Sequence, residues 1–505
     1  MPGFVIACDL GTGGNKAALY DSAGVSRAET FVGYPTSYPR ADHHEQRPTD
    51  WYAAVVSSIR ALLAESGVTG ADVAAIALSG QSLGCVPLDA DGHLLQEQTP
   101  IWSDGRASAE AAEFFTRVPE TDWYMRTGNG FPPPLYPVFK AMWLRRHAPE
   151  VFGRARVLLG SKDYVNFRLT GRIATDHSYA SGSGVYDLAR GRYSAELLAA
   201  AELPPELLPA PLASTDILGP LRQDAAAELG LPPTVKVIAG GVDNSCMALG
   251  ARNLSEGSVY NSLGSSSWVT VTSSKPVLDP VARPFVFAHV LPGLFNSAMS
   301  TFSSGTSLKW ILDLVQPDGD YDALFALAAT SPAGANRLLF IPTLAGGTIL
   351  EGGPTTRGGL VGLDLSHTRA DVARATLEGV AFSLKMALDR LRNMVSVGNE
   401  MIAVGGGARN DLWRQIYADV YGMDVVRTTV DKSAAALGAA ALALVATGHW
   451  SDAAPLAKLH VEVARASPDA NRRRLYDDLA PAYRAAAKSM ADLGRMLSKS
   501  QETQK

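Results

Sequence analysis

The chain has 505 residues, a formal net charge of -5 and 47% hydrophobic residues. Its length exceeds the roughly 250–300 residues at which a single core stops growing, so we expect two large domains. The hydrophobic content excludes a disordered chain. The acidic balance without a long basic run argues against a nucleic-acid partner, because phosphate-backbone binding needs a clustered cationic surface.

The cysteine content and the hydropathy pattern favour a cytoplasmic protein. The three cysteines, Cys8, Cys85 and Cys246, have no metal-ligand spacing and are too few for a disulfide framework. Residues 4–8 form a strand-like run with no cationic leader before it. The longest small-apolar run, residues 434–448, is shorter than the roughly 20 residues of a membrane span and predicts a buried helix.

In the first half of the chain, glycine turns separate short apolar runs. A hairpin is predicted at the start, with two strands around the turn at residues 11–14, and Thr49-Asp50 is predicted to cap the first helix. The predicted strands cover residues 4–8, 16–20 and 73–78, and the predicted helices cover residues 51–66 and 138–147.

Around residue 240 the same pattern restarts. The segment Asp9-Leu10-Gly11-Thr12 aligns with Ser262-Leu263-Gly264-Ser265, and each segment stands near the start of one half of the chain. Strands alternating with helices then predict two related α/β domains, at residues 1–252 and 253–505. The predicted strands are 235–239, 258–263, 268–272 and 401–404, with turns at 240–241, 264–267 and 405–407, and helices at 244–251 and 411–421. The tail after about residue 486 is polar, and fraying is expected at its end.

The most informative motif is the first one, DLGTGGNK at residues 9–16. A carboxylate at a strand end followed by glycines suits Mg²⁺ and phosphate together, because Mg²⁺ takes carboxylate ligands and glycines let backbone N–H groups approach phosphate oxygens. Lys16 would add positive charge. The alternative is an ordinary hairpin turn. A Walker A loop is excluded because the chain has no Gly-Lys dipeptide, and neither glycine turn fits the dinucleotide pattern.

Two further motifs stand at strand ends. Asp243, after Gly240-Gly241, is a candidate general base, with the glycines leaving space beside it for a ligand; the alternative is a plain N-cap. The segments at residues 79–84 and 101–106 hold Gln81, Trp102 and Asp104, which are candidates to read sugar hydroxyls. The alternative is a core Trp102 and a local ion pair between Asp104 and Arg106.

The turn at residues 405–410, GGGARN, would admit a flat base or a ribose against its backbone, although a simple strand–helix connection explains it as well. Taken together and in this order, the motifs resemble those of the FGGY family of carbohydrate kinases, over residues 4–448. The most specific part is residues 405–438, and the segments at 161–171 and 175–187 are also similar to the family. Xylulokinases are the most similar members.

The resemblance implies a two-domain actin-like ATPase (ribonuclease H-like) α/β fold, with ATP, Mg²⁺ and sugar bound in a cleft between domains that closes over them. It implies that Asp243 takes the proton from the sugar hydroxyl, and that Asp9 and Asp243 hold Mg²⁺. The residues it assigns to ATP are Gly11, Thr12, Gly13, Lys16, Gly264, Ser265, Ser266, Gly305, Gly406, Gly407 and Asn410. Those it assigns to the sugar are Gln81, Ser82, Leu83, Trp102, Asp104, Asp243 and Asn244.

One departure concerns the substrate. Typical xylulokinases carry Met-His where this chain has Ser82-Leu83, so an imidazole hydrogen bond to the sugar is replaced by an apolar group. The expected reaction is phosphorylation of D-xylulose to D-xylulose 5-phosphate, with another pentulose or a short polyol (ribulose, erythritol, glycerol) as the alternative. Two different functions also fit the fold: a non-catalytic sugar- or nucleotide-binding regulator, and an actin-like filament or chaperone ATPase. A homodimer is expected, since dimers are common among symmetric enzymes.

The three cysteines each lie within three residues of a proposed site motif. The simple explanation is that Cys acts as a small buried hydrophobe at strand ends. The competing hypothesis is that modification of these thiols blocks the site.

Overall fold

Strand β1 (Phe4–Leu10) lies near the centre of the first sheet of the computed structural model, which describes residues 2–502, with side chains through residue 498. It pairs antiparallel with β2 (Gly14–Asp21), which pairs with β3 (Ser26–Gly33), and it pairs parallel with β6 (Val73–Gly80). Beyond β6 come β15 (Lys236–Val242), parallel, and β14 (Ile217–Pro220), antiparallel. The sheet order is therefore β14-β15-β6-β1-β2-β3, and the predicted hairpin start is confirmed.

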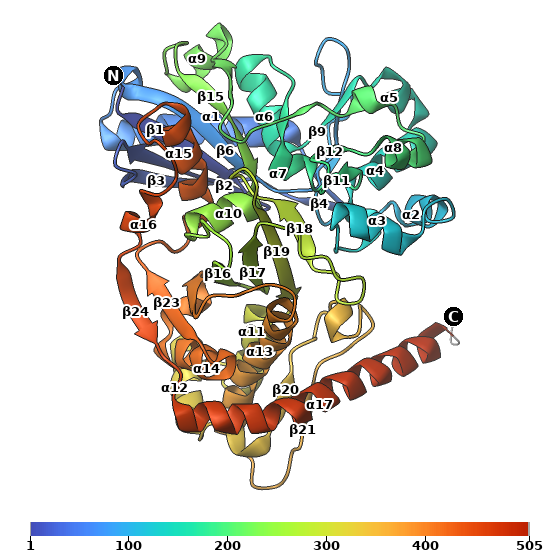
Figure 1. Cartoon of the computed structure of the whole chain (residues 1–505), viewed down its shortest axis with the longest axis vertical. Coiled ribbons are helices and arrows are strands. Elements are labelled where there is room, and N and C mark those ends of the chain that lie inside the picture. The colour runs from blue at the N-terminus through green and yellow to red at the C-terminus, as the bar shows by residue number, and fades with distance from the viewer. Residues whose placement is uncertain (1, 503–505) are drawn as a thin grey trace. The chain divides into compact units, whose positions relative to one another are not determined.

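The alternation of side chains along β1 separates the two faces of this sheet. Ile6, Cys8 and Leu10 belong to a core cluster that includes apolar residues of α1 (Pro48–Ser66). The alternate residues, including Asp9, therefore project from the opposite face. That face packs against α10 (Asp243–Gly250) and α15 (Ala434–Ala446), and Figure 1 shows α15 beside β1. Asp9 is thus directed toward the side of the sheet that carries Asp243.

Two glycines bring α10 and α15 into close contact. A Cβ atom on Gly250 would lie 1.8 Å from the carbonyl oxygen of Ala434, and one on Gly438 would lie 1.9 Å from that of Cys246. A side chain at either position would force the helices apart. The run that was predicted to be a buried helix from its composition is therefore held against α10, and so helps to set the position of Asp243 at the start of that helix.

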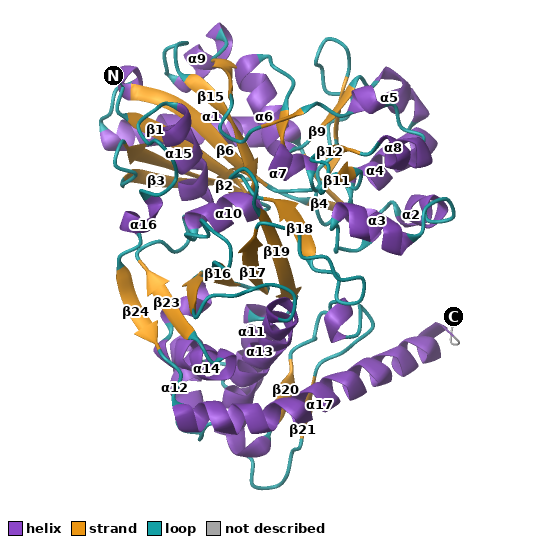
Figure 2. Cartoon of the chain, viewed as in Figure 1, coloured by secondary structure: helices purple, strands orange, loops and turns teal. Residues whose placement is uncertain are grey.

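The remaining elements of this part of the chain are short, and Figure 2 shows the helices among them in purple. A small sheet has the order β4-β5-β8, and β7 pairs with β9. These elements are β4 (Ser37–Arg40), β5 (His43–Gln46), β7 (Val86–Leu88), β8 (Thr99–Pro100), α2 (Ser108–Phe114), α3 (Glu120–Thr127), α4 (Pro137–His147), α5 (Pro149–Arg154), β9 (Val157–Leu159), α6 (Ser161–Thr170), α7 (His177–Ala180), α8 (Ala195–Ala201) and α9 (Gln223–Leu229).

A second sheet repeats the arrangement of the first. β16 (Val259–Leu263) pairs antiparallel with β17 (Ser267–Ser273) and parallel with β22 (Glu400–Val404), which pairs parallel with β23 (Asp424–Thr428). This order, β17-β16-β22-β23, has the same strand directions as β2-β1-β6-β15. The other principal elements are β18 (Phe285–Ala288), β19 (Phe295–Thr301), α11 (Gly305–Val315), α12 (Tyr321–Ala329), β20 (Leu339–Ile341), β21 (Gly359–Val361), α13 (Arg369–Arg392), α14 (Asp411–Tyr421), β24 (Glu462–Ala466) and α17 (Ala470–Glu502).

The chain divides into two compact units, each made of separate segments. The first unit contains the residues up to Ser255 together with Thr272–Ser297 and Ser433–Leu459, and the second contains Glu256–Val271, Ala298–Lys432 and the residues from His460 onward. The division at residue 252 stays a prediction. Within residues 2–502, no helix is long and apolar enough to cross a membrane.

Two local predictions were wrong, and a third is not tested. α1 begins at Pro48, and its N-cap is Arg47 without a side-chain hydrogen bond; a proline fits the first turn because its missing N–H needs no partner there. β15 continues through the two glycines that were predicted to form a turn. The tail after about Ala486 is helical as far as Glu502, and α17 still packs at Ala491, which is only 6% exposed; the end that was predicted to fray lies outside the described residues.

Candidate active site

The carboxyl group of Asp9 lies one residue before the end of β1. It accepts a hydrogen bond from Ser79 Oγ at 2.9 Å, from the position paired with it in β6. Burial raises the pKa of Asp9, while this hydrogen bond and the charge of Lys16, its partner in β2, oppose the rise. Lys16 itself is exposed. Asp9 is therefore a half-buried acid whose cationic neighbour lies at the surface.

Asp243 is the first residue of α10. Its Oδ1 accepts hydrogen bonds from the backbone N of Asn244 at 2.7 Å and from Asn244 Nδ2 at 3.0 Å. Burial, and then the negative charge of Asp9, raise the pKa of Asp243 to about 7. The two acids are thus electrostatic neighbours within the first unit. The N-cap of α10 is Val242, so the alternative of a plain N-cap at Asp243 is wrong.

A buried charge network fixes the backbone just before Asp243. The amide of Val242 donates to Ser178 Oγ at 3.0 Å, and Ser178 in turn hydrogen-bonds to Asp176. Lys162 lies 2.9 Å from Asp176 and pairs with Asp163 as well. Because every member of this network is buried, the start of α10 is held from several directions.

The prediction that Gly240 and Gly241 leave space for a ligand beside Asp243 is wrong. A Cβ atom on Gly240 would lie 2.0 Å from the carbonyl oxygen of Leu78, and one on Gly241 would lie 2.4 Å from a methyl carbon of Val290. Both positions are filled by the protein itself. These glycines allow β15 to approach its neighbours closely, and Gly240 also takes a φ of 73° that suits glycine.

The turn between β1 and β2 is held by hydrogen bonds at both of its ends. The amide of Gly11 donates to the carbonyl of Gly14 at 3.0 Å, and Tyr34 Oη donates to the carbonyl of Gly11 at 2.5 Å. For the amides of Thr12 and Gly13, no backbone acceptor is found among residues 2–502. Two successive N–H groups in a glycine-rich turn form a concave surface that suits an anion.

Sequence reasoning missed Gln46, which connects this turn to the predicted sugar residue Gln81. Gln46 Nε2 donates to the carbonyl of Thr12 at 2.7 Å, and Gln46 Oε1 accepts from Gln81 Nε2 at 2.7 Å. Both glutamines are only 1% exposed. Gln81 Oε1 is buried and has no hydrogen-bond partner within the described residues, so it remains as a free acceptor.

Trp102 and Asp104 have different surroundings. Trp102 is 37% exposed, which excludes the alternative of a core residue, and its Nε1 donates to Thr12 Oγ1 at 2.8 Å. Asp104 is fully buried and accepts hydrogen bonds from Arg106 and from the backbone of His44. The ion pair considered as the alternative for Asp104 is therefore present, and contact of Asp104 with a sugar stays a prediction.

A buried lysine, Lys140, holds the backbone of the Ser82-Leu83 segment in place. Lys140 Nζ donates to the carbonyls of Leu83 at 2.8 Å and of Ile101 at 2.6 Å. Leu83 has a φ of 58°, is 1% exposed and belongs to a core cluster. Its side chain therefore packs inside the protein, and a direct contact between Leu83 and a substrate stays a prediction.

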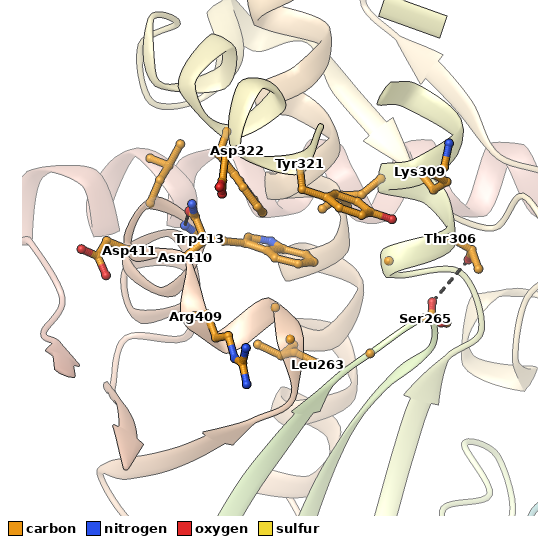
Figure 3. Close-up of a pocket in the computed structure, with 17 residues that line it drawn as sticks. Leu263, Ser265, Thr306, Lys309, Tyr321, Asp322, Arg409, Asn410, Asp411 and Trp413 are labelled. Atoms are coloured by element: carbon orange, nitrogen blue, oxygen red, sulfur yellow. Dashed lines mark hydrogen bonds between the residues drawn. The ribbon is translucent and has the colours of Figure 1, made fainter. Parts of the chain in front are cut away.

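The second unit contains a pocket of about 770 Å³. It brings together most residues predicted to bind the nucleotide from this unit: Gly264, Ser265, Gly305, Gly406, Gly407 and Asn410. Ser266 is not among its lining residues. Figure 3 shows Tyr321 of α12 and Trp413 of α14 on one side of this pocket, with Leu263 and Ser265 on the other.

Hydrogen bonds define both polar ends of the pocket. At one end, the carbonyls of Gly264 and Ser265 accept from the amides of Gly305 at 3.0 Å and Thr306 at 3.2 Å. At the other, Asp431 accepts from the amide of Gly405 at 2.9 Å and pairs with Arg409 at 2.8 Å. The first contact seats the turn after β16 on the start of α11, and the second fixes the glycine turn after β22.

The sequence reasoning did not identify the aromatic residues of this pocket. The ring centroids of Phe325 and Trp413 lie 6.0 Å apart, and a Cβ atom on Gly407 would lie 2.8 Å from the ring of Trp413. A usable signal was present, since Tyr321 and Phe325 are four residues apart and so share one face of a helix. Trp413 was overlooked because it lies inside an amphipathic helix, where an aromatic residue predicts core packing.

The cysteines behave as buried hydrophobic residues. Cys8, Cys85 and Cys246 are at most 1% exposed. Burial raises the pKa of Cys8 and of Cys85 to about 12, and that of Cys246 also lies well above its usual range. Thiols that are neither exposed nor ionised are poor targets for modification, so the geometry favours the simple explanation.

Comparison with known proteins identifies the family. The N-terminal domain of the FGGY family of carbohydrate kinases matches residues 4–250, and its C-terminal domain matches residues 259–447. The xylulose kinase of Bacillus subtilis (strain 168) is 31% identical over 498 residues, which cover 98% of each chain.

Two solved structures from Lactobacillus acidophilus are similar over 97% of this chain and 98% of their own. A ligand-bound xylulose kinase gives a TM-score of 0.91 at 27% identity, and a gluconate kinase gives a TM-score of 0.91 at 26% identity. Because the family matches cover more than half of the residues, the chain belongs to the FGGY family of carbohydrate kinases, and it is a sugar kinase with the two-domain α/β fold of that family.

Proposed function

We propose that this sugar kinase transfers the γ-phosphoryl group of ATP to a neutral ketose, D-xylulose before all others, with Asp243 as the general base. The observation that carries the proposal is the half-buried pair of acids, Asp9 and Asp243, whose charges interact within one unit. The xylulose kinases among the similar proteins support the choice of sugar. Ribulose, erythritol and glycerol are the alternative substrates.

The environment of Asp243 suits proton transfer at neutral pH. A general base works best when its pKa lies near the operating pH, since it is then both available and basic enough. Burial and Asp9 raise the pKa of Asp243 to about 7. Asn244, which donates two hydrogen bonds to the same oxygen, would fix the direction of the second carboxylate oxygen, which is the one proposed to accept the proton of the sugar hydroxyl.

The same pair of acids fits a divalent cation. Mg²⁺ is usually bound through one or two carboxylates together with substrate phosphates. Two neighbouring half-buried carboxyl groups provide the negative charge that such an ion would balance. Asp9, with Asp243 beside it, would hold Mg²⁺, which when bound supplies charge neutralisation to the phosphates; Ser79 would keep Asp9 in place.

Each unit contains one turn that is a candidate for phosphate contact. In the first, the amides of Thr12 and Gly13 are directed to no other backbone group of the described chain, and Lys16 lies near Asp9. In the second, Gly264 and Ser265 line the pocket that also contains Gly406, Gly407 and Asn410. We propose that this pocket binds the adenosine, because its aromatic side chains and bare glycine backbone offer flat surfaces to a base.

A neutral sugar fits this unit better than a sugar acid, although one of the similar structures is named a gluconate kinase. The buried cations of this unit already have partners. Arg106 pairs with Asp104 and Glu45, Lys162 pairs with Asp163 and Asp176, and Lys140 donates to two backbone carbonyls. A substrate carboxylate would meet the charges of Asp9 and Asp243, near which the one cation that we identify is the exposed Lys16. Gln81 Oε1, a buried acceptor, instead matches a hydroxyl donor.

A coupled ADP-release assay on a substrate panel tests the proposal. The panel contains D-xylulose, D-ribulose, erythritol, glycerol, D-gluconate and a no-sugar control. We expect D-xylulose to give the highest kcat/KM and D-gluconate to give none above background. ADP release that does not depend on any sugar would favour an actin-like ATPase, and nucleotide binding without turnover would favour a regulator. The homodimer stays a prediction.

A further inference from the structure

Gln46, at the end of β5, makes four side-chain hydrogen bonds although it is almost fully buried. Its Nε2 donates to the carbonyl of Thr12 at 2.7 Å and to Thr36 Oγ1 at 2.8 Å. Its Oε1 accepts from Trp51 Nε1 at 2.9 Å and from Gln81 Nε2 at 2.7 Å. Both donors and both acceptor lone pairs of the amide group are thereby used.

The direction of every bond in this network is fixed by chemistry. The indole N–H of Trp51 can only donate and the backbone carbonyl of Thr12 can only accept. The amide of Gln46 must therefore present its oxygen to Trp51 and its nitrogen to Thr12, and the reverse assignment is excluded. Since the oxygen of Gln46 accepts, Gln81 has to donate through its nitrogen, which leaves Gln81 Oε1 as a free acceptor.

The bond to Thr12 also determines where the next amide points. The Thr12 carbonyl and the Gly13 N–H belong to one planar peptide unit, and in a trans peptide the two groups point in opposite directions; the chain has no cis peptide bond among its described residues. By holding the Thr12 carbonyl toward the interior, Gln46 directs the Gly13 N–H outward. A second contact, from Trp102 Nε1 to Thr12 Oγ1, restrains the side chain of the same residue.

We propose that Gln46 is a positioning residue for phosphate binding: it holds the Thr12–Gly13 peptide so that the Gly13 N–H faces a phosphate oxygen of the nucleotide. The inference rests on the proposed assignment of this turn to phosphate. Gln46 touches no reacting atom, and it acts through Thr12. Because it also bonds Gln81, it ties the phosphate turn to the segment that carries the proposed sugar residue.

The change Gln46→Glu tests the inference, because it keeps the shape and the accepting oxygen but removes the donors to Thr12 and Thr36. Titration of the full-length protein with Mg²⁺ and a non-hydrolysable ATP analogue should give about a tenfold weaker Kd, which corresponds to one lost hydrogen bond of about 1.4 kcal/mol. The KM of the sugar should change by less than about twofold, because the acceptor for Gln81 is retained. At lower pH the introduced carboxyl group regains a proton and one donor, so the deficit in nucleotide affinity relative to the unchanged protein should shrink.

The matched control is Asn129→Asp, the same amide-to-acid change in the same unit. Asn129 is 2% exposed, and its Nδ2 donates to the carbonyls of Ser181 at 2.9 Å and Thr127 at 3.3 Å. The Asn129→Asp variant should be less stable than the unchanged protein and should show no selective loss of nucleotide affinity. The inference would be overturned if the Gln46→Glu and Asn129→Asp variants bound the nucleotide with equal affinity. It would also be overturned if Gln46→Glu raised the KM of the sugar as much as it raised the Kd of the nucleotide.

If Gln46→Glu does not fold, Gln46→Met is measured by the same nucleotide titration, and a Kd equal to that of the unchanged protein would overturn the inference. The KM of the sugar is not compared for Gln46→Met, because this change also removes the acceptor for Gln81. Nucleotide binding is measured without any sugar. A failure of the proposed substrate would therefore appear in the substrate panel and would leave this titration intact, whereas a failure of the positioning role would appear in the titration alone.

Discussion

The turn after β1 and the turn after β16 occupy the same place in two sheets that share the arrangement of four strands, β2-β1-β6-β15 and β17-β16-β22-β23. Each follows the central strand, and each is closed by one backbone bond, from Gly11 to Gly14 and from Gly264 to Ser266. They differ at the position two residues before the glycine, where the first turn has Asp9 and the second has Ser262. The scaffold is repeated, but the carboxylate is present in only one copy.

The difference between the two turns is consistent with the binding roles proposed for them. Asp9 raises the pKa of Asp243, and a partly desolvated charge of that kind destabilises the fold, so we expect it only where the site uses it. The second turn faces a pocket whose lining includes Leu263, Phe325 and Trp413, and a serine avoids a second buried carboxylate there. A repeated fold can thus keep its geometry in both copies while the reacting charges are confined to one.

The largest expected effect comes from Asp243→Asn, which removes the proposed base and preserves its shape. The kcat should fall roughly 10²–10⁴-fold, the usual value of general-base assistance, while binding of the nucleotide to the second unit persists. Steady-state kinetics with the best sugar and calorimetry with an ATP analogue measure the two effects. Turnover near that of the unchanged protein would remove Asp243 from the mechanism.

The same change should stabilise the ligand-free protein at high pH. The pKa of Asp243 is about 7 in the folded chain, against an ordinary value of 3.8. Between these values the folded state holds a proton that the unfolded state has released, so stability falls as pH rises through this window and is constant above it. The Asp243→Asn variant has no carboxyl group at this position, so its stability does not fall for this reason. Its Tm should exceed that of the unchanged protein at pH 8, and the difference should shrink toward pH 4.

A smaller effect is expected for Asp9→Asn, and it separates the two turns directly. Removing the neighbouring charge lowers the pKa of Asp243, so the acid limb of the kcat/KM profile should move down by about one pH unit. Mg²⁺ affinity should fall roughly 10–100-fold. The paired variant Ser262→Ala should leave both quantities unchanged, because Ser262 supplies no charge. A shift of the pH profile by both variants, or by neither, would contradict the distinction between the turns.

The sequence predicted those parts of the molecule that local signals determine. The helix at residues 411–421 and the strand–turn–strand units have clear ends, because glycines and polar residues interrupt apolar runs. Asp9 and Asp243 were predicted because strand ends collect site residues in α/β folds, and the structure brings their charges into interaction. Gln46 was missed because its contacts are with residues 34 and 35 positions away in the chain. The two glycines in β15 were misread because their reason is close packing, which no local pattern reveals.

The smallest expected effect is that of Tyr321→Ala in the second unit. This change should weaken nucleotide binding and leave the site of Asp9 and Asp243 unaltered, so it sharpens the comparison between the two units. Tyr321 lines the pocket and is 44% exposed, so its ring can be removed without opening the core. An aromatic contact is worth about 0.5–1.5 kcal/mol beyond its area, which predicts up to about a tenfold rise in the KM of ATP. The pH profile and the KM of the sugar should not change, because both are set in the first unit.

Trp310→Ala is the matched control, since Trp310 is 51% exposed in the same unit and does not line the pocket. Equal effects of the two variants on the KM of ATP would show that the pocket is not where the base binds, and the contrast between a charged unit and a base-binding unit would then fail.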